Sequence, residues 1–319
     1  MQRFSLTRAL PWVALVTVWI LWGSTYLGIR VAVQTIPPFL MAGTRYVIAG
    51  LVLSAVMLAW KPGLLRELRA AQWRSLVTTA FLLLGIGNGF LCFAEMTVPS
   101  GVAAIVVATV PIWMVVIAAL VNRTRIAAAS LAGLALGMIG IVLLAGMPGA
   151  GMPLLPTVLM LVGSFAWALG SVYARKHAEL RGNPLIPALE MFAGGLILCI
   201  MGLMTGESAQ LHLDAITRPS IYGWLWLIGP GALIGYTAYG YAVRKLPTQI
   251  VATYGYVNPI VAVALGAVLL QEPVTLNVIA GGVSILLAVI VILSTQQRKV
   301  QREEPVVVQL DECQIAEVG

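Results

Sequence analysis

Residues 98–113, "VPSGVAAIVVATVPIW", return in altered form at residues 246–261 as "LPTQIVATYGYVNPIV". A shift of 148 residues superposes the two stretches and places Pro111 on Pro259. Similarity of a chain with itself at a fixed offset is the mark of a duplicated structural unit. The sequence is therefore read first as two related halves.

Matches on either side of this stretch extend the duplication. The shift of 148 also brings Gly87 to Gly235 and Gly133 to Gly281, whereas nearer the start of each half a shift of 145 brings Trp22 to Trp167 and Gly50 to Gly195. The predicted organisation is a first repeat over 12–147 and a second over 154–294. A short N-terminal segment, 1–11, precedes them, and a tail, 295–319, follows.

Composition identifies the surroundings of these repeats as a lipid bilayer. The chain is 60% hydrophobic and 10% charged, with a mean hydropathy of +0.95, which is far from a soluble globular protein. Apolar runs of about 20 residues, enough to cross the hydrocarbon core as helices, predict an all-α membrane protein with ten transmembrane helices. The runs lie near 12–33, 38–59, 73–94, 99–120, 126–145, 154–173, 185–204, 220–242, 248–270 and 275–294.

Five helices in each repeat impose an inverted arrangement. If the first repeat starts on the cytoplasmic side, an odd number of crossings makes the second start on the other side. Inverted repeats are typical of secondary transporters, because exchanging the conformations of the halves exchanges the open side. The alternative is a duplication that serves stability alone.

The distribution of basic residues orients the chain. Sixteen of the 19 Lys and Arg residues fall in loops on one side or in the two terminal segments, Arg30 and Arg218 fall on the other side, and Arg45 lies within a helix. By the positive-inside rule both termini are expected in the cytoplasm. This asymmetry accounts for the net charge of +7, so no nucleic-acid partner is expected. The polar, mixed-charge tail is expected to be disordered.

Three stretches carry a resemblance to a known family. They are "WGSTYLGIRVAVQTIPPFLMAGTRYVIAG", "GNGFLCFAEMTVPSGVAAIVVATVPIW", and "TYGYVNPIVAVALG" followed by "EPVTLNVIAGGVSIL". Together they resemble the EamA branch of the drug/metabolite transporter superfamily, and within it the YedA-like exporters. The resemblance covers about residues 12–294. It implies two inverted repeats, a bacterial inner-membrane location and export of small metabolites or drugs, without naming a substrate.

Arg45 is a charge inside the second expected helix, where it is costly unless it is paired or faces a wet cavity. It lies seven residues, roughly 10 Å, below the outer end of that helix, and Glu95 ends the third helix on the same side. The two predict an ion pair in fork geometry, with Asn88 two turns before Glu95 on the same face. Two interpretations stay open: a pair that fixes helix packing, and an outer site that binds an anionic substrate group or couples to a proton.

Glu190 occupies the position of Arg45 in the second repeat, by the shift of 145 residues. It lies in the inner third of the seventh expected helix, within reach of cations at the inner helix ends. An interfacial salt bridge is favoured over a role in transport.

Pro111 and Pro259 fall near the middle of the fourth and ninth expected helices. Each lacks an N–H group and displaces the carbonyl four residues earlier, at Val107 and Gly255. Two such kinks at equivalent positions of the repeats predict a site near the membrane midplane.

Polar and aromatic residues supply candidate walls for this site. Asn258 precedes the second proline, and Tyr254 lies one turn before Asn258 on the same face. Trp22 and Tyr26 are one turn apart in the first helix, and Tyr236 lies in the eighth. The alternative for these aromatic residues is interface anchoring or the filling of helix contacts.

Catalytic motifs are missing from the sequence, so no enzyme is expected. Asp214 and Asp311 are the only aspartates and lie outside the expected helices, and His177 and His212 lie in expected loops. Neither a two-aspartate intramembrane protease nor a Ser–His dyad within the membrane is available. Walker A and metal-binding motifs are also missing, so no cofactor or metal is expected.

The expected function is export of a small-molecule substrate by alternating access, with the lipid bilayer as the surroundings. Proton coupling, exchange and facilitated flux stay open, as do the substrate and the oligomeric state. A lipid flippase is the alternative within transport, and an intramembrane enzyme is the alternative from another class.

Overall fold

The structure is a computed structural model, and it describes residues 6–98, 103, 106–145 and 154–269, together with 276, 279–281, 283–284, 286–288 and 290–291. The predictions for the first five residues and for the tail at 295–319 lie outside this described part. The tenth expected helix, 275–294, is described only at scattered positions.

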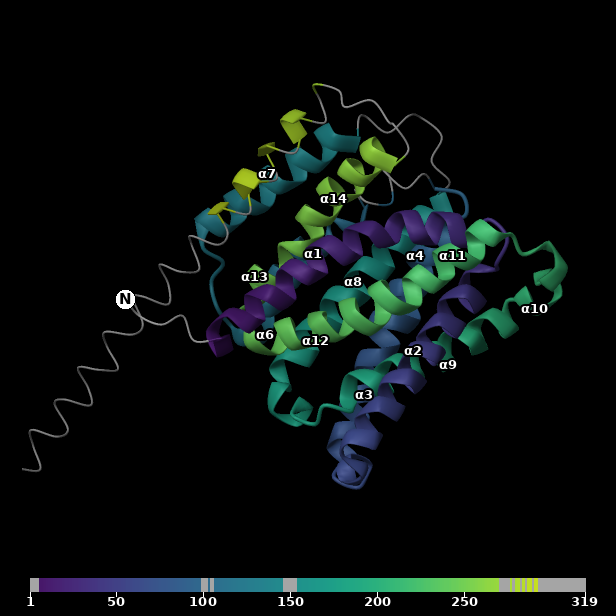
Figure 1. Ribbon diagram of the computed structural model, residues 1–319. Coiled ribbons are helices and arrows are strands. Elements are labelled where there is room, and N and C mark those ends of the chain that lie inside the picture. The colour runs from purple at the N-terminus through teal and green to yellow at the C-terminus, as the bar shows by residue number, and fades with distance from the viewer. Residues whose placement is uncertain are drawn as a thin grey trace, which may run out of the picture.

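The described residues form helices joined by turns and short connections, and no strand occurs among them (Figure 1). Segments η2 and η5 are π-helical, and η1, η3 and η4 are short 3₁₀ turns. In chain order the elements are α1 (Leu6–Ala32), α2 (Pro38–Trp60), η1 (Pro62–Leu65), α3 (Ala70–Thr79), η2 (Ala80–Asn88), α4 (Gly89–Ala94), α6 (Val110–Asn122), α7 (Ala128–Ala145), α8 (Leu154–Lys176), η3 (Ala178–Arg181), α9 (Ile186–Met204), α10 (Glu207–Gln210), η4 (Leu213–Ala215), α11 (Arg218–Trp226), η5 (Leu227–Tyr236), α12 (Thr237–Lys245), α13 (Thr248–Ala252) and α14 (Tyr254–Leu269).

Five helices of the described part are long and apolar enough to cross a membrane. They are Ala9–Ala32, Pro38–Trp60, Ala70–Ala94, Leu154–Lys176 and Ile186–Met204. Shorter apolar helices fall within four of the other expected spans. The chain is thus an all-helical membrane protein, and the number of ten spans stays a prediction. The first helix begins at Leu6, inside the segment expected to precede it.

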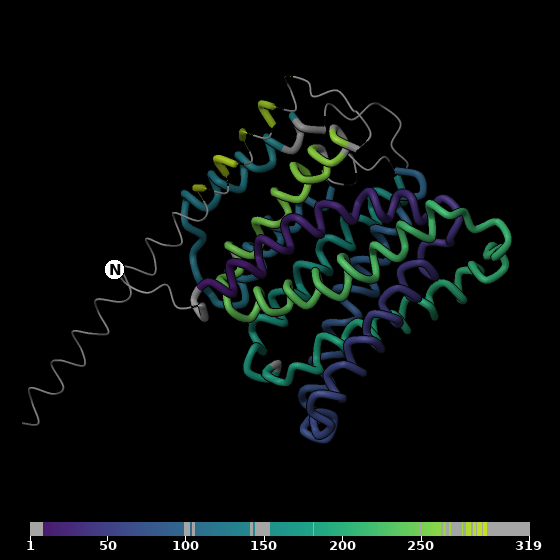
Figure 2. The backbone as a smooth tube through the Cα atoms, viewed as in Figure 1, coloured from purple at the N-terminus to yellow at the C-terminus, as the bar shows by residue number. Residues whose placement is uncertain are grey.

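Two helices are continuous rods with a π-helical middle. In one, η2 joins α3 to α4, and in the other, η5 joins α11 to α12; the second rod runs beside α1 in Figure 2. The shift of 148 residues carries 80–88 onto 228–236, so the two π segments occupy equivalent positions in the repeats. A π segment inside an α-helix is rare and is often found at a functional site.

The equivalent helices α2 and α9 pack against each other through glycine (Figure 1). A Cβ atom on Gly50 would lie 2.5 Å from the backbone nitrogen of Phe192, and one on Gly195 would lie 2.5 Å from that of Val47. Gly43, earlier in α2, meets Cys199, later in α9. The helices are therefore antiparallel, which is the inversion that the repeat predicted. Only a glycine permits so close an approach of two backbones.

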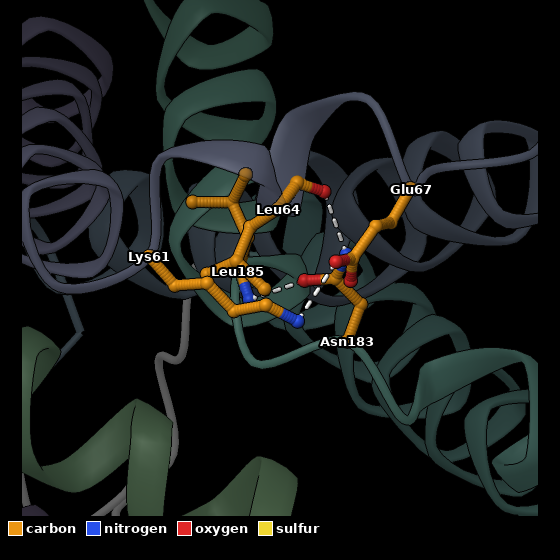
Figure 3. Close-up of polar contacts among 5 residues, drawn as sticks. All are labelled: Lys61, Leu64, Glu67, Asn183 and Leu185. Atoms are coloured by element: carbon orange, nitrogen blue, oxygen red, sulfur yellow. Dashed lines mark hydrogen bonds and ion pairs between the residues drawn. The ribbon is translucent and has the colours of Figure 1, made fainter.

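One end of the α2–α9 pair is tied together by Asn183, which precedes α9 (Figure 3). Its amide nitrogen donates to the carbonyl of Leu64 (2.8 Å), and its amide oxygen accepts from the backbone nitrogen of Leu185 (2.9 Å). Nearby, Lys61 and Glu67 form an exposed ion pair of 2.7 Å. This end also carries Arg69, at the start of α3, and we call it the basic end.

The opposite end of the same pair is tied by Glu207, which begins α10. Its two carboxylate oxygens accept from the backbone nitrogens of Phe39 (3.0 Å) and Leu40 (2.8 Å) in the first turn of α2. A carboxylate at a helix N-terminus satisfies N–H groups that have no partner within the helix. In both ties a side chain of the second repeat holds backbone groups of the first.

The remaining helices of the two repeats are interleaved. Helix α1 packs against α11, η5, α12 and α14 of the second repeat, whereas α8 packs against η2, α4 and α6 of the first. The matched tryptophans make equivalent contacts: a Cβ on Gly235 would lie 2.6 Å from Trp22 Nε1, and a Cβ on Gly87 would lie 3.0 Å from Trp167 Cε3. The repeat found in the sequence thus reappears as a repeated packing arrangement.

The fourth expected helix, 99–120, is interrupted. A turn at Ala108 and Thr109 precedes α6, so Pro111 lies in the first helical turn, where its missing N–H group has no helical partner to lose. The ninth is divided at Thr253, and Pro259 lies inside α14. The apolar run concealed both breaks. A Cβ on Gly255 would lie 2.8 Å from Pro111 Cγ, so the repeats touch at this point.

Candidate functional site

A cavity lies between the two repeats and contains about 690 Å³ of unfilled space, counting its open mouth. It is lined by helices of both repeats, and six of the eight polar and aromatic residues predicted for the site are among its walls. The lining consists of Trp22, Thr25, Tyr26, Ile29, Arg45, Tyr46, Gly87, Asn88, Leu91, Val107, Val110, Met160, Gly163, Ser164, Trp167, Gly231, Tyr254 and Asn258.

The cavity occupies the half of the bundle away from the basic end. In α1 its walls run from Trp22 to Ile29, near the last residue of the helix, and in α2 they are Arg45 and Tyr46, nearer to Pro38 than to Trp60. The site is therefore one-sided rather than central to the whole bundle.

Arg45 is the charged residue of the lining and is 3% exposed. Its Nη2 donates to Asn88 Oδ1 (2.7 Å) and to the hydroxyl of Tyr46 (3.2 Å), and its guanidinium carbon lies 4.5 Å from the centre of the Tyr46 ring. Its Nε has no hydrogen-bond partner within the described part of the chain. A buried guanidinium with an unused donor is suited to binding an anion from the cavity.

The expected ion pair between Arg45 and Glu95 does not form. No distance of 4.0 Å or less joins their charged atoms in the structure. The reason is depth: Arg45 lies seven residues below the start of α2, and Asn88 lies seven residues before Glu95, so the amide rather than the carboxylate stands level with the guanidinium. Glu95 is also outside the cavity lining.

Glu95 is fully buried one residue beyond the span Ala70–Ala94. Its carboxylate oxygens have no hydrogen-bond partner among the described residues, although its backbone oxygen accepts from Arg30 Nη1 (2.7 Å). Burial raises the pKa of the Glu95 carboxyl to about 8, against the lowering influence of Arg45 and Arg30. The protonated form is thereby favoured near neutral pH.

Three aromatic residues of the lining, Trp22, Trp167 and Tyr254, pack with Tyr239, which lies outside the lining. Five ring contacts join these four residues, with ring centres 4.8–5.7 Å apart. Trp22 Nε1 also donates to the carbonyl of Gly231 (3.1 Å), which fixes its ring. Edge-on and tilted contacts of this kind are favourable beyond their buried area.

Nearer the basic end, polar contacts join α8 to α12. The hydroxyls of Ser171 and Tyr239 share a hydrogen bond, and Arg175 Nη1 donates to the carbonyls of Val243 (3.1 Å) and Arg244 (2.8 Å). These contacts lie in the half of the bundle that contains the basic end. The cavity therefore lies on one side of these contacts.

Asn258 lies at the cavity wall and is 3% exposed. With the amide nitrogen turned toward the two nearby carbonyls, it donates to Tyr254 (3.0 Å) and to Trp19 (3.1 Å). It therefore connects α14 with α1 across the repeats. Val107, four residues before Pro111, is part of the lining, whereas Pro111 and Pro259 are not.

Tyr236 was also predicted for the site and is not part of the lining. It is 2% exposed, donates to Glu190 Oε2 (3.4 Å), and lies with its ring 6.3 Å from that of Tyr46. Glu190 itself is 1% exposed, and its expected interfacial salt bridge stays a prediction. Its helix packs against α2 and η2.

Several residues of the cavity lining were not predicted from the sequence. Trp167 could have been found, because it is the repeat partner of Trp22. Tyr46, Met160, Ser164 and the glycines gave no signal, since residues of these types occur throughout membrane helices for packing. Among the described residues, no group of three or more His, Cys, Asp or Glu could hold a metal ion.

Comparison with known proteins agrees with this architecture. A profile of the EamA-like transporter family matches the chain twice, at residues 10–146 and 154–294. The inner membrane transporter YedA of Escherichia coli K12 is 38% identical over 88% of this chain and 90% of its own. A probable amino-acid metabolite efflux pump of Salmonella typhimurium LT2 is 25% identical over 84% and 89%, and protein PecM of Dickeya dadantii is 28% identical over 88% and 92%.

A solved crystal structure shares the fold, with a TM-score of 0.74 and 20% identity over 90% of this chain and 97% of that one. Two antiparallel repeats around a one-sided cavity are an arrangement typical of membrane transporters. The chain belongs to the EamA-like transporter family.

Proposed function

We propose that the protein exports a small metabolite across the bacterial inner membrane by alternating access, and that the cavity around Arg45 is its substrate site. The observation that carries this proposal is the cavity itself, which is lined by both repeats and holds a buried guanidinium with an unused donor.

The chemistry of the lining favours a substrate with an acidic group and an apolar body. Arg45 supplies the cation for the acidic group, and Trp22, Trp167 and Tyr254 supply an aromatic surface. Amino acids and their analogues have this character. The relative in Salmonella typhimurium named a probable amino-acid metabolite efflux pump supports the same class.

Orientation gives the direction of the open side. With the basic end in the cytoplasm, as the positive-inside rule predicts, the cavity opens to the periplasm and the Ser171–Tyr239 contact closes the cytoplasmic half. Such a state would release an exported substrate. Protons are a candidate coupling ion, with exchange and facilitated flux as the alternatives.

Flux through purified protein in liposomes tests the proposal. Liposomes loaded with a panel of labelled amino acids and analogues should lose at least one of them faster than liposomes without protein, and Arg45→Gln should abolish that flux. Lys61→Gln, at an exposed ion pair outside the cavity, is the matched control and should leave flux unchanged. Movement of labelled lipid without movement of any panel member would establish the flippase alternative instead.

A further inference from the structure

Several equivalent positions of the two repeats make the same contacts. Trp22 and Trp167 each press on a glycine of the other repeat's π segment. Arg30 donates to the carbonyl of Glu95, and its equivalent Arg175 donates to the carbonyl of Val243, which is the equivalent of Glu95 by the shift of 148. The symmetry therefore extends to individual hydrogen bonds.

One pair of positions departs from this symmetry in the sign of its charge. Arg45 of α2 corresponds to Glu190 of α9, and its partner Asn88 corresponds to Tyr236. Both pairs are hydrogen-bonded across the same two helices of their repeat: Arg45 donates to Asn88 (2.7 Å), and Tyr236 donates to Glu190 (3.4 Å). In each cluster an ionisable side chain is hydrogen-bonded to a polar partner, and that side chain is basic in the first repeat and acidic in the second.

The two clusters lie at different depths and touch. Tyr46, which accepts from Arg45, has its ring 6.3 Å from that of Tyr236. Glu190 lies in the second turn of α9, whose start is tied to the basic end by Asn183, whereas Arg45 lies in the second turn from the opposite end of α2. One cluster thus lines the open cavity, and the other is buried in the closed half.

Alternating access in an inverted repeat follows from exchanging the conformations of the halves. The present lining includes Tyr26, Ile29, Arg45 and Asn88, so the exchanged state would be lined by their equivalents Ser171, Ala174, Glu190 and Tyr236. In that state a carboxylate takes the place that a guanidinium holds in the structure described above.

We infer that Glu190 and Tyr236 form a second binding site, exposed when the protein opens to the cytoplasm, and that this site takes the cationic group of the substrate. This inference rests on the proposed transport function and narrows its substrate class. A substrate whose ammonium group meets Glu190 on entry and whose carboxylate meets Arg45 before release is a small zwitterion. A purely anionic metabolite would be repelled at Glu190.

Charge-selective thiol labelling tests the site without knowledge of the substrate. Cys92, Cys199 and Cys313 are replaced by alanine, and Ser171→Cys is introduced in inside-out membrane vesicles. The rates of a cationic and an anionic membrane-impermeant methanethiosulfonate are each divided by the rate of the same reagent with a free thiol, because a thiolate itself favours the cationic reagent. From the cytoplasmic side the corrected rate should be roughly tenfold higher for the cationic reagent. Glu190→Gln should bring the ratio of the two corrected rates close to one.

Ser164→Cys in right-side-out vesicles is the matched control, because Ser164 and Arg45 line the same cavity. There the corrected rate should be higher for the anionic reagent, and Arg45→Gln should remove the preference. Ala174→Cys, one turn nearer the basic end, repeats the cytoplasmic measurement if loss of the Ser171 hydroxyl impairs folding.

The outcomes separate the inference from the function on which it rests. Cytoplasmic labelling at positions 171 and 174 with no cation preference, or with a preference that Glu190→Gln leaves unchanged, would overturn the second site and leave transport intact. Labelling at 164 from outside with none at 171 or 174 from inside would contradict alternating access itself, and the inference with it.

Discussion

Arg45 is held by an amide and a tyrosine, and this partnership leaves its positive charge uncompensated by a nearby carboxylate. The prediction of Glu95 as its partner rested on charge, although the sequence also held the depth of each residue. Counting seven residues from Pro38 and seven back from Glu95 gives Asn88 as the residue at the same level. The sequence thus predicted that Arg45 and Asn88 belong to the site. It did not predict that they are partners, because opposite charge was given more weight than the rise of each helix.

Double-mutant cycles should separate the two possible partners of Arg45. Arg45→Ala and Asn88→Ala should show a coupling of about 1–2 kcal/mol in the free energy of unfolding, because they share a charge-assisted hydrogen bond. The cycle of Arg45→Ala with Glu95→Ala should give a smaller coupling. Denaturation of the purified protein in detergent measures both. A larger coupling of Arg45 to Glu95 than to Asn88 would show that the two charged residues form the ion pair after all.

The pH dependence of stability should reveal the raised pKa of Glu95. Its folded-state pKa of about 8 exceeds the ordinary 4.5, so the folded protein holds the proton more tightly than the unfolded chain. The resulting stabilisation is fully present below pH 4.5 and is lost as the pH rises through about 8. Between about pH 6.5 and 9 the melting temperature of wild type should fall more than that of Glu95→Gln. Parallel curves for the two proteins would show that Glu95 titrates normally.

At the scale of elements, helices α2 and α9 are held to each other along their length. Glycines bring their backbones together along the middle, and Asn183 and Glu207 tie their ends. The elements that line the cavity include α2 and two π segments at equivalent positions of the repeats. Wider hydrogen-bonded turns provide a place where a helix can change its local winding.

Alanine should destabilise the protein at a glycine within this helix pair and should have little effect at a glycine that precedes α9. Gly195→Ala places a Cβ atom 2.5 Å from the backbone nitrogen of Val47, so the helices must separate, at a cost of about 1–3 kcal/mol. Gly182→Ala is the control, because no atom lies within 4 Å of the added carbon. Folded yield and melting temperature in detergent measure both. Equal stability of the two variants would show that α2 and α9 do not approach so closely.

The sequence predicted elements well where apolar length decides them and less well where local winding does. All five long spans were expected, because composition alone reports a helix in lipid. The π segments and the break at Ala108 and Thr109 were not, since the apolar run continues through them unchanged. Pro111 gave a real signal, but a helix start and a mid-helix kink use the same residue.

The duplication found by aligning the chain with itself is the feature of the whole molecule that was most fully predictable. Matched tryptophans and glycines of the sequence make matched contacts in space. The interleaving of the repeats was not predictable, because hydropathy records which helices form and not which of them touch. Two of the matches, Arg30 with Arg175 and Asn88 with Tyr236, became visible only through their hydrogen bonds.

Topology mapping should place the basic end in the cytoplasm. A single cysteine at Gly63, between α2 and α3, should be protected from an impermeant reagent in whole cells, and one at Gly149, between the repeats, should react. A phosphatase fused after Gly319 should be inactive, because it requires the periplasm. The reverse pattern would show the opposite orientation in the membrane, with the cavity on the cytoplasmic side.

The contact between Trp22 and Gly231 joins positions 209 residues apart. At a synthesis rate of about 5–20 residues per second, helix α1 is made roughly 10–40 s before the chain that receives it. During this interval its tryptophan face has no permanent neighbour and must rest against lipid or the insertion machinery. Biogenesis, rather than final stability, is therefore the stage at which a polar substitution on that face of α1 should first be harmful.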